Sequence, residues 1–228
     1  MKKRITVAVL TLMFIWLLAA CLPEKDKSAA SSVSSVRTEE NSSDILVQSP
    51  MTISNNDLFI INGKHQYLRL KMVRGTYKED WNPGAYMGTL WEGSFIMELA
   101  DELGNTIAST ELSGVYTEPL IFHTTFQIHF DDYNNDGDMD FTIGQYASSN
   151  GNTYKLFTLR SDGKIEELPV KDHTSLFISD TTGYYSTKLT KVDDTSFTTE
   201  YYDNAKGKTI EEIFKWDGKA FIQDNITQ

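Results

Sequence analysis

Acidic and amide side chains are concentrated in one short stretch, residues 131–140, which reads DDYNNDGDMD. Counted from the first ligand position, oxygen-bearing side chains fall at positions 1, 3, 5 and 9, which are Asp132, Asn134, Asp136 and Asp140. Gly137 permits a sharp turn, and Asp138 stands where such a loop offers a backbone carbonyl. Calcium takes about six to eight oxygen ligands, so this spacing predicts a calcium loop with a structural role. Magnesium, which demands a stricter octahedron, and a charged turn that holds no ion are the alternatives.

The flanks of this loop differ from those of an EF-hand. Ile143 stands where an EF-hand places its bidentate glutamate, and the flanking segments FHTTFQIHF and MDFTIGQYA alternate like β-strands. The loop is therefore expected to close a β-hairpin. Its ligand pattern, followed by Phe141 and Gly144, resembles the calcium loop of the FG-GAP and VCBS-type repeats of bacterial surface proteins and integrin propellers. The resemblance occurs once, within residues 132–144, and implies calcium more than it implies a complete propeller.

Other residue types that carry chemistry form no comparable pattern. His123 and His129 share one face of FHTTFQIHF, but a strand would place them roughly 20 Å apart, too far to share an ion. Glu92 and Glu98 would be separated by a similar distance on one strand, which argues against a catalytic carboxylate pair. The common hydrolase and nucleotide-binding motifs are missing from the sequence.

An aromatic segment, WNPGAYMGTLW at Trp81–Trp91, suggests a second kind of site. Its glycine, proline and aromatic residues suit an exposed loop that stacks on a carbohydrate or a partner protein. The alternative is that Trp81, Tyr86 and Trp91 are core residues around irregular turns.

The chain begins with the features of an export signal. Lys2, Lys3 and Arg4 precede the apolar run Ile5–Leu18, which is short for a membrane span and typical of a secretory signal peptide. The ending LAAC, which places a cysteine at Cys21, resembles the lipobox of bacterial lipoproteins. The resemblance implies that Cys21 receives a diacylglycerol group and that residues 1–20 are removed. An uncleaved membrane helix and an ordinary signal peptide are the alternatives.

A tether and one domain are expected to follow the signal. Residues 21–44 are rich in serine and charged residues and have no aromatic residue, so they are predicted to be disordered. Residues 45–228 suffice for a single extracytoplasmic domain. Cys21 is the only cysteine, so no intramolecular disulfide can form. The formal net charge of −11 argues against a nucleic-acid partner.

The remaining sequence predicts an all-β fold. Alternating apolar runs are separated by tight-turn dipeptides, which are Asn62-Gly63, Gly104-Asn105, Asp162-Gly163 and Asp217-Gly218. An antiparallel β-sandwich or a curled sheet built of hairpins is expected. A small or partial β-propeller is the alternative, because the similar turns RSDGK and KWDGK suggest repeated units. Thr209–Trp216 is the one segment that also fits a short helix.

These inferences predict a lipoprotein held at the outer face of a cell membrane, with a calcium-stabilised β domain that acts as a binding or interaction module of the cell envelope. Its expected contacts are the membrane and a carbohydrate or protein ligand. A hydrolase acting on envelope or extracellular polysaccharide and an accessory subunit of a membrane or surface complex are the alternatives.

Overall fold

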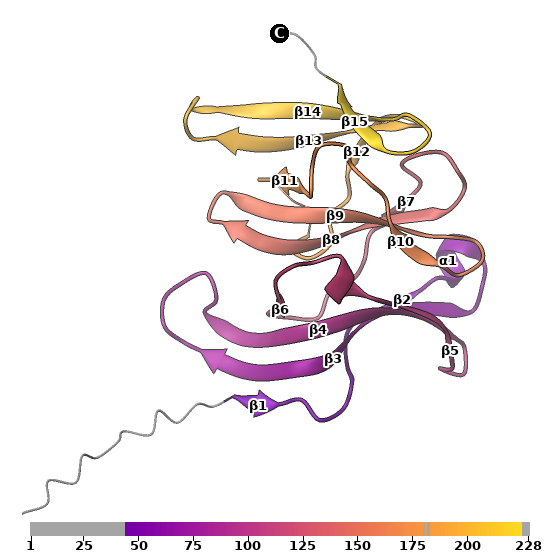
Figure 1. The fold of residues 1–228 in the computed structure, drawn as a ribbon, viewed down its shortest axis with the longest axis vertical. Coiled ribbons are helices and arrows are strands. Elements are labelled where there is room, and N and C mark those ends of the chain that lie inside the picture. Colours follow the sequence, from indigo (N-terminus) through magenta and orange to yellow (C-terminus); the bar gives the residue numbers. More distant parts are fainter. Residues whose placement is uncertain (1–43, 180, 182, 225–228) are drawn as a thin grey trace, which may run out of the picture. The chain divides into compact units, whose positions relative to one another are not determined.

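The computed structural model describes residues 44–179, 181 and 183–224, which fold almost entirely into antiparallel β-sheet (Figure 1). The predicted all-β fold is confirmed. The predicted signal peptide, Cys21 and nearly all of the predicted tether lie outside the described residues. Within the part of the chain that is described, no helix has the length and apolar character needed to cross a bilayer.

The first sheet is built around one long hairpin. Its strands β3 and β4 pair from Gln66 opposite Asp101 to Asp80 opposite Gly88. Strands β1 and β2 pair with β3, and strands β5 and β6 pair with β4. The strand bounds are β1 (Ile45–Leu46), β2 (Met51–Asp57), β3 (Gln66–Asp80), β4 (Gly88–Asp101), β5 (Thr106–Glu111) and β6 (Leu120–Phe122). A single turn of α-helix, α1 (Phe59–Asn62), connects β2 to β3, and a short 3₁₀ turn, η1 (Leu112–Gly114), follows β5.

The second and third sheets follow in chain order. The middle sheet has the order β10-β9-β8-β7, with β11 also paired to β9, and the third sheet has the order β12-β13-β14-β15. The middle strands are β7 (Phe130–Asp131), β8 (Met139–Ser148), β9 (Gly151–Leu159), β10 (Ile165–Glu167) and β11 (Leu176–Ile178). The third sheet contains β12 (Thr190–Asp193), β13 (Ser196–Asp203), β14 (Lys208–Trp216) and β15 (Phe221–Asp224).

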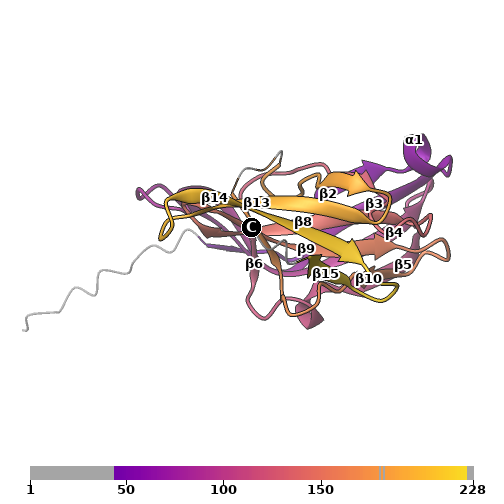
Figure 2. The same ribbon diagram turned by 90° about the horizontal axis from the view of Figure 1, so that it is seen from above.

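Two hydrophobic cores lie between the three sheets, one at each interface. The first core joins the first and middle sheets through buried residues that include Leu70, Phe95, Phe141 and Phe157. The second joins the middle and third sheets through buried residues that include Tyr154, Leu156, Phe197 and Phe214. Figure 2 looks down this stack, with β13 and β14 lying over β8 and β9. The sheets are open, and the fold is a layered arrangement of sheets rather than a closed barrel.

Three of the four turn dipeptides lie in non-helical turns between paired strands, as the sequence predicts. Gly104-Asn105 lies between β4 and β5, Asp162-Gly163 between β9 and β10, and Asp217-Gly218 between β14 and β15. Asn62-Gly63 instead ends α1, and Gly63 caps the helix with a φ of 73°. The turn is still a connection between paired strands, but it contains a helical turn.

The prediction of one regular strand over Phe122–Phe130 was wrong. Strand β6 ends at Phe122 and β7 begins at Phe130, and the residues between them are irregular. Two backbone N–H groups near β7 donate to side chains: Ile128 N–H donates to Asn56 Oδ1 at 2.7 Å, and His129 N–H donates to Ser186 Oγ at 3.1 Å. Side chains rather than a neighbouring strand therefore satisfy these donors, which allows the segment to cross between the first and middle sheets.

The possible helix at Thr209–Trp216 was also wrong. The segment belongs to β14, which pairs with β13 on one side and β15 on the other. Phe214 from this strand is buried in the second core beside Phe197, with the ring centroids 5.5 Å apart. Pairing on both sides and burial of Phe214 outweigh the helical tendency of the Glu-Glu-containing segment.

Candidate functional site

The aspartate-rich loop connects β7 to β8, and the hairpin predicted for it is confirmed. Phe130 pairs with Phe141, and Asp131 pairs with Asp140 across the base of the loop. This pairing brings the two ends of residues 131–140 together, so ligand positions that are distant in the loop become neighbours in space.

The first half of the loop folds around its own side-chain oxygens. Asp132 accepts hydrogen bonds from the backbone N–H groups of Asp136 and Gly137, at 3.2 and 3.0 Å. Asn134 Oδ1 also accepts from Asp136 N–H, at 3.3 Å. Asn135 and Gly137 have φ angles of 59° and 83°, in the left-handed region, which produces the sharp turn that the glycine permits. Asp132, Asn134 and Asp136 therefore surround the same backbone turn.

Asp140 closes the loop as a deeply buried carboxylate. Its exposed fraction is 0%, and Oδ2 accepts a hydrogen bond from Tyr133 N–H at 2.9 Å. Oδ1 is buried and has no hydrogen-bond partner among the described residues. Burial raises the pKa of Asp140 to about 7, and the neighbouring carboxylates of Asp136 and Asp132 add to the increase. The Thr158 hydroxyl, on the paired strand β9, acts to lower this pKa, but burial outweighs it, so a proton or a cation would stabilise the Asp140 carboxylate.

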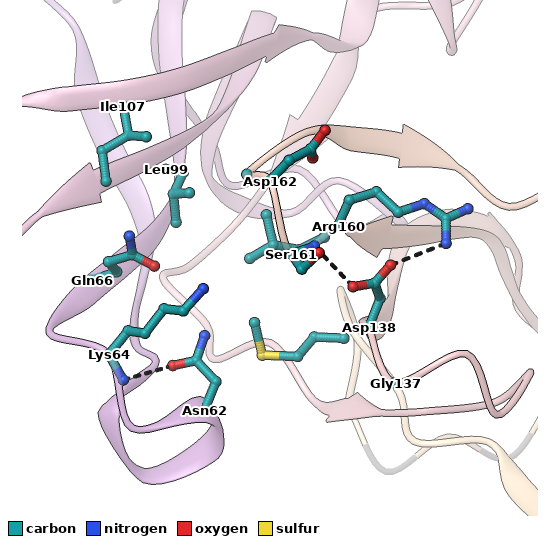
Figure 3. Close-up of a pocket in the computed structure, with 13 residues that line it drawn as sticks. Asn62, Lys64, Gln66, Leu99, Ile107, Gly137, Asp138, Arg160, Ser161 and Asp162 are labelled. Atoms are coloured by element: carbon teal, nitrogen blue, oxygen red, sulfur yellow. Dashed lines mark hydrogen bonds and ion pairs between the residues drawn. The ribbon is translucent and has the colours of Figure 1, made fainter.

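Asp138 is directed away from the centre of the loop. Figure 3 shows its carboxylate between Arg160 and Ser161, where it accepts from the Ser161 N–H at 2.8 Å and from the Arg160 guanidinium at 3.2 Å. The side chain thus fastens the loop to the turn between β9 and β10. Its carboxylate is therefore occupied by protein partners, and the backbone-carbonyl role of Asp138 stays a prediction.

Basic side chains offset much of the negative charge of the loop. Arg160 also contacts Asp136 Oδ2 at 2.5 Å, and Lys188 contacts Asp131 at 3.1 Å. Burial alone would raise the pKa of Asp136, but hydrogen bonds from Asp138 N–H, Asn134 and Arg160 hold it below its usual range. Hydrogen bonds to Asp136 therefore outweigh its burial, whereas those to Asp140 do not.

The side chains of the loop are not arranged as a ready-made metal site. Among the described residues, no three His, Cys, Asp or Glu side chains form a group that could hold a metal ion. Asn134 and the backbone carbonyls are additional oxygen donors, and Arg160 lies against one oxygen of Asp136. Asp140 Oδ1 has no hydrogen-bond partner among the described residues, whereas Asp136 Oδ2 is occupied by Arg160. Calcium binding stays a prediction.

The glutamates and histidines considered from the sequence lie in separate environments. Glu92 and Glu98 lie on β4, and Glu98 is buried against Lys71 at 3.0 Å and Arg69 at 3.6 Å. Burial acts to raise the pKa of Glu98, but hydrogen bonds from Lys71 and Thr106 lower it, which favours a structural ion pair. His123 stacks on Tyr86, with the ring centroids 6.1 Å apart.

The aromatic segment is divided between an exposed loop and a strand. Trp81 and Tyr86 are exposed in the connection between β3 and β4, as one of the two alternatives predicted. Trp91 lies on β4 and packs against the first core, as the alternative of a core role predicted. Tyr86 also contacts the edge of Tyr146 from β8, at 5.6 Å between centroids. The loop thus extends to the middle sheet.

Beside Tyr86 is a cleft of about 650 Å³ that the sequence did not reveal. Its lining includes Glu92, Tyr116, His123, Gln145, Tyr146 and Tyr185. These residues come from both the first and middle sheets and from the connections that follow them. Their spacing in the chain has no regular period, so only the tertiary fold reveals that they are neighbours.

Comparisons with protein-family models, with curated proteins and with solved structures found no match to this chain. The case for a function therefore depends on the residues and geometry described above.

Proposed function

We propose that this chain is a lipoprotein, anchored at the outer face of a cell membrane through Cys21, whose β domain binds calcium and acts as a binding or interaction module. The observation that supports the calcium site best is the buried Asp140 carboxylate, whose Oδ1 has no hydrogen-bond partner among the described residues. A divalent cation would neutralise this carboxylate and the adjacent carboxylates together.

Five residues of the loop would hold the ion. The proposed donors are the side chains of Asp132, Asn134, Asp136 and Asp140 and the backbone carbonyl of Asp138. Bound calcium would supply positive charge and fasten the connection between β7 and β8. Because Tyr133 from the loop packs in the second core and its N–H donates to Asp140, the ion would also stabilise the contact with the third sheet.

A polysaccharide hydrolase is the second candidate, because two acidic residues, Glu92 and Glu118, line the same cleft. Retaining and inverting glycosidases use a pair of carboxyl groups. Glu92, however, forms an ion pair with Lys78 at 2.7 Å. That partner stabilises a charged carboxylate, whereas a glycosidic general acid must carry a proton. The binding module is therefore the preferred function.

Thermal unfolding tests the calcium site. The full-length protein in detergent is unfolded first in EDTA and then at calcium concentrations up to about 10 mM, with magnesium as a parallel titration. Extracellular modules bind calcium with dissociation constants of about 0.1–1 mM, which corresponds to a stabilisation of roughly 1.4–2.7 kcal/mol at about 10 mM. We expect a saturable rise of about 3–10 °C in melting temperature.

The variant Asp136→Ala should lose this rise. Asp217→Ala is the matched control, because Asp136 and Asp217 each accept a hydrogen bond from the N–H two residues later, at 2.9 and 2.8 Å. We expect the control to keep the full response to calcium. An equal rise in the parent and in Asp136→Ala would show that the ion binds elsewhere, and no rise in the parent would show that the loop is a charged turn.

A further inference from the structure

The cleft beside Tyr86 has the size and composition of a small-ligand site. Its volume of about 650 Å³ lies within the range of about 300–1,000 Å³ that is usual for such sites. Its lining includes aromatic and polar side chains, which come from two sheets that share the first core and from their connections. Strands β4, β6, β8 and β9 supply part of the lining, and connections that include Tyr86, Tyr116 and Tyr185 supply the rest.

Aromatic rings line the cleft in fixed relative orientations. The rings of Tyr86 and His123 are nearly parallel, at an angle of 12°, and Tyr146 meets Tyr86 at 71°. Tyr86 is 41% exposed, so part of its surface is open to a ligand. The face of an aromatic ring is electron-rich and attracts the polarised C–H groups of a ligand that is laid against it.

Neutral hydrogen-bonding groups line the same cleft. The Tyr185 hydroxyl accepts a hydrogen bond from His123 N–H at 2.8 Å, which leaves its own proton for a ligand. Burial raises the pKa of Tyr185 to about 12, so this donor stays protonated. The Gln145 amide is held by Ile121 N–H and by the Gly144 carbonyl, both at 2.8 Å, and its second N–H is not used in these two bonds.

The charges that face the cleft largely compensate one another. Lys155 pairs with Glu167 at 2.8 Å and lies over the Tyr116 ring, and Glu92 pairs with Lys78. Burial lowers the pKa of His123, so its imidazole is neutral at physiological pH. Glu92 and Glu118 disfavour an anionic ligand, and Lys155 disfavours a cationic one.

We infer that this cleft binds a neutral oligosaccharide, with a sugar face laid against Tyr86 and Tyr146 and its hydroxyl groups bonded to Tyr185 and Gln145. A neutral sugar presents C–H groups on its ring faces and hydroxyl groups around its edge, which matches a cleft lined by both aromatic rings and neutral donors and acceptors. The inference rests on the proposed function only in that the domain binds a ligand. It does not depend on calcium.

Calorimetric titration of the full-length protein tests the inference. The protein is kept in a polyoxyethylene detergent, which has no sugar head group, with calcium present. The probes are three neutral tetrasaccharides, maltotetraose, cellotetraose and tetra-N-acetylchitotetraose, and one acidic tetrasaccharide, tetragalacturonic acid. We expect at least one neutral probe to bind with a measurable dissociation constant and the acidic probe to bind more weakly. No binding of the neutral probes up to about 10 mM, or tighter binding of the acidic probe, would overturn the inference.

Substitutions locate the site. Tyr86→Ala and Tyr146→Ala should each weaken binding on the order of tenfold, the effect of losing one aromatic contact. Tyr202→Ala is the matched control, because Tyr202 is also 41% exposed but lies on β13 in the third sheet. Equal affinity in the parent and in both cleft variants would overturn the inference.

Melting temperatures with and without calcium keep this result separate from the proposed function. Each tyrosine variant should keep the parent's response to calcium, because none of these residues belongs to the aspartate-rich loop. Saccharide binding without any calcium response would support the cleft and contradict the calcium loop, and the converse result would contradict the cleft alone. Mass spectrometry of the saccharide after titration should show an intact tetrasaccharide, whereas cleavage that is lost in Glu92→Gln would replace the inferred binding site with a hydrolase site.

Discussion

The carboxyl group of Asp140 links the stability of the protein to pH. Its pKa of about 7, against an ordinary value of 3.8, results first from burial and then from nearby negative charge. Between about pH 4 and pH 7 the folded chain therefore binds more protons at this group than the unfolded chain does. Stability from this group is present below about pH 4 and is lost as the pH rises to about 7, by roughly 4 kcal/mol for a shift of this size.

Replacing Asp140 with asparagine should remove this dependence in the metal-free protein. Urea unfolding in EDTA between about pH 4.5 and about pH 8 gives the free energy of unfolding of the parent and of Asp140→Asn. Acids with a lowered pKa, such as Asp101 and Asp203, increase the free energy of unfolding as the pH rises. They are present in both proteins and therefore contribute equally to both curves. The difference between the two curves therefore isolates Asp140, and parallel curves would contradict its raised pKa.

At the scale of single residues, the sequence predicts contacts between residues that are close together in the chain. The spacing of Asp132, Asn134 and Asp136 identified residues that surround one turn, because a loop ligand pattern depends on neighbours in the chain. Arg160 was missed, although it contacts Asp136 and Asp138, because it comes from the far end of β9. Ion pairs between residues far apart in the chain follow no fixed spacing, so a sequence pattern cannot predict them.

At the scale of elements, the hairpin of β3 and β4 depends on two glycines that face each other. Gly75 pairs with Gly93 immediately after the irregular register between Met72 and Arg74. A Cβ atom on Gly93 would lie 2.1 Å from the Arg74 carbonyl oxygen and 2.7 Å from the Gly75 Cα. Both contacts are with backbone, so a side chain at Gly93 would force the strands apart.

Gly93→Ala should therefore destabilise the protein by about 1–3 kcal/mol, the usual cost of inserting an atom into a packed site. Gly84→Ala, in the exposed connection of the same hairpin, is the control, because a Cβ atom there would meet nothing within 4 Å. Urea unfolding at constant pH measures both. Equal stability of the two variants would show that the strands separate at no cost.

The two elements that sequence patterns assigned wrongly have a common physical cause. Burial alternates over residues 125–130, where Ile128 is buried and Thr125 and Gln127 are exposed, although the segment forms no regular strand. A period of two in the sequence indicates which side chains face a core. It does not indicate whether the backbone N–H groups donate to another strand or to a side chain such as Asn56. For 209–216, tertiary packing decided between helix and strand.

At the scale of the whole molecule, fold class was predictable and layering was not. Turn dipeptides and alternating apolar residues are local features, and they indicate hairpins. The two similar turns, RSDGK and KWDGK, belong to hairpins in successive sheets. That the hairpins stack as three layers depends on contacts between residues far apart in the chain, such as Tyr133 and Phe197, whose rings lie 5.7 Å apart.

The proposed anchor predicts where the molecule is held. Cys21→Ala removes the only thiol, so the variant should carry no diacylglycerol and should retain residues 1–20. Mass spectrometry of the membrane fraction compares the N-terminal peptides of the parent and the variant. The same lipid mass on both, or an unmodified cysteine in the parent, would contradict the lipobox assignment.

The middle sheet belongs to both cores, so the three sheets are expected to unfold together. Strand β9 alone supplies Phe157 and Leu159 to the first core and Tyr154 and Leu156 to the second. Loss of either core would expose one face of the middle sheet to water, at a cost of about 1.5–3 kcal/mol for each large apolar side chain. A state with only one core folded is therefore disfavoured.

Tryptophan fluorescence can test this cooperativity, because Trp91 packs against the first core and Trp216 against the second. Trp81→Phe combined with Trp216→Phe leaves Trp91 as the reporter in the described residues, and Trp81→Phe combined with Trp91→Phe leaves Trp216. In each background, adding Phe214→Ala should destabilise the protein by about 3–5 kcal/mol. The fluorescence of Trp91 should respond to this loss as strongly as that of Trp216, although Phe214 lies in the second core. A lower urea midpoint for Trp216 alone would mean that the third sheet unfolds by itself, and calcium would then stabilise the aspartate-rich loop without stabilising the whole domain.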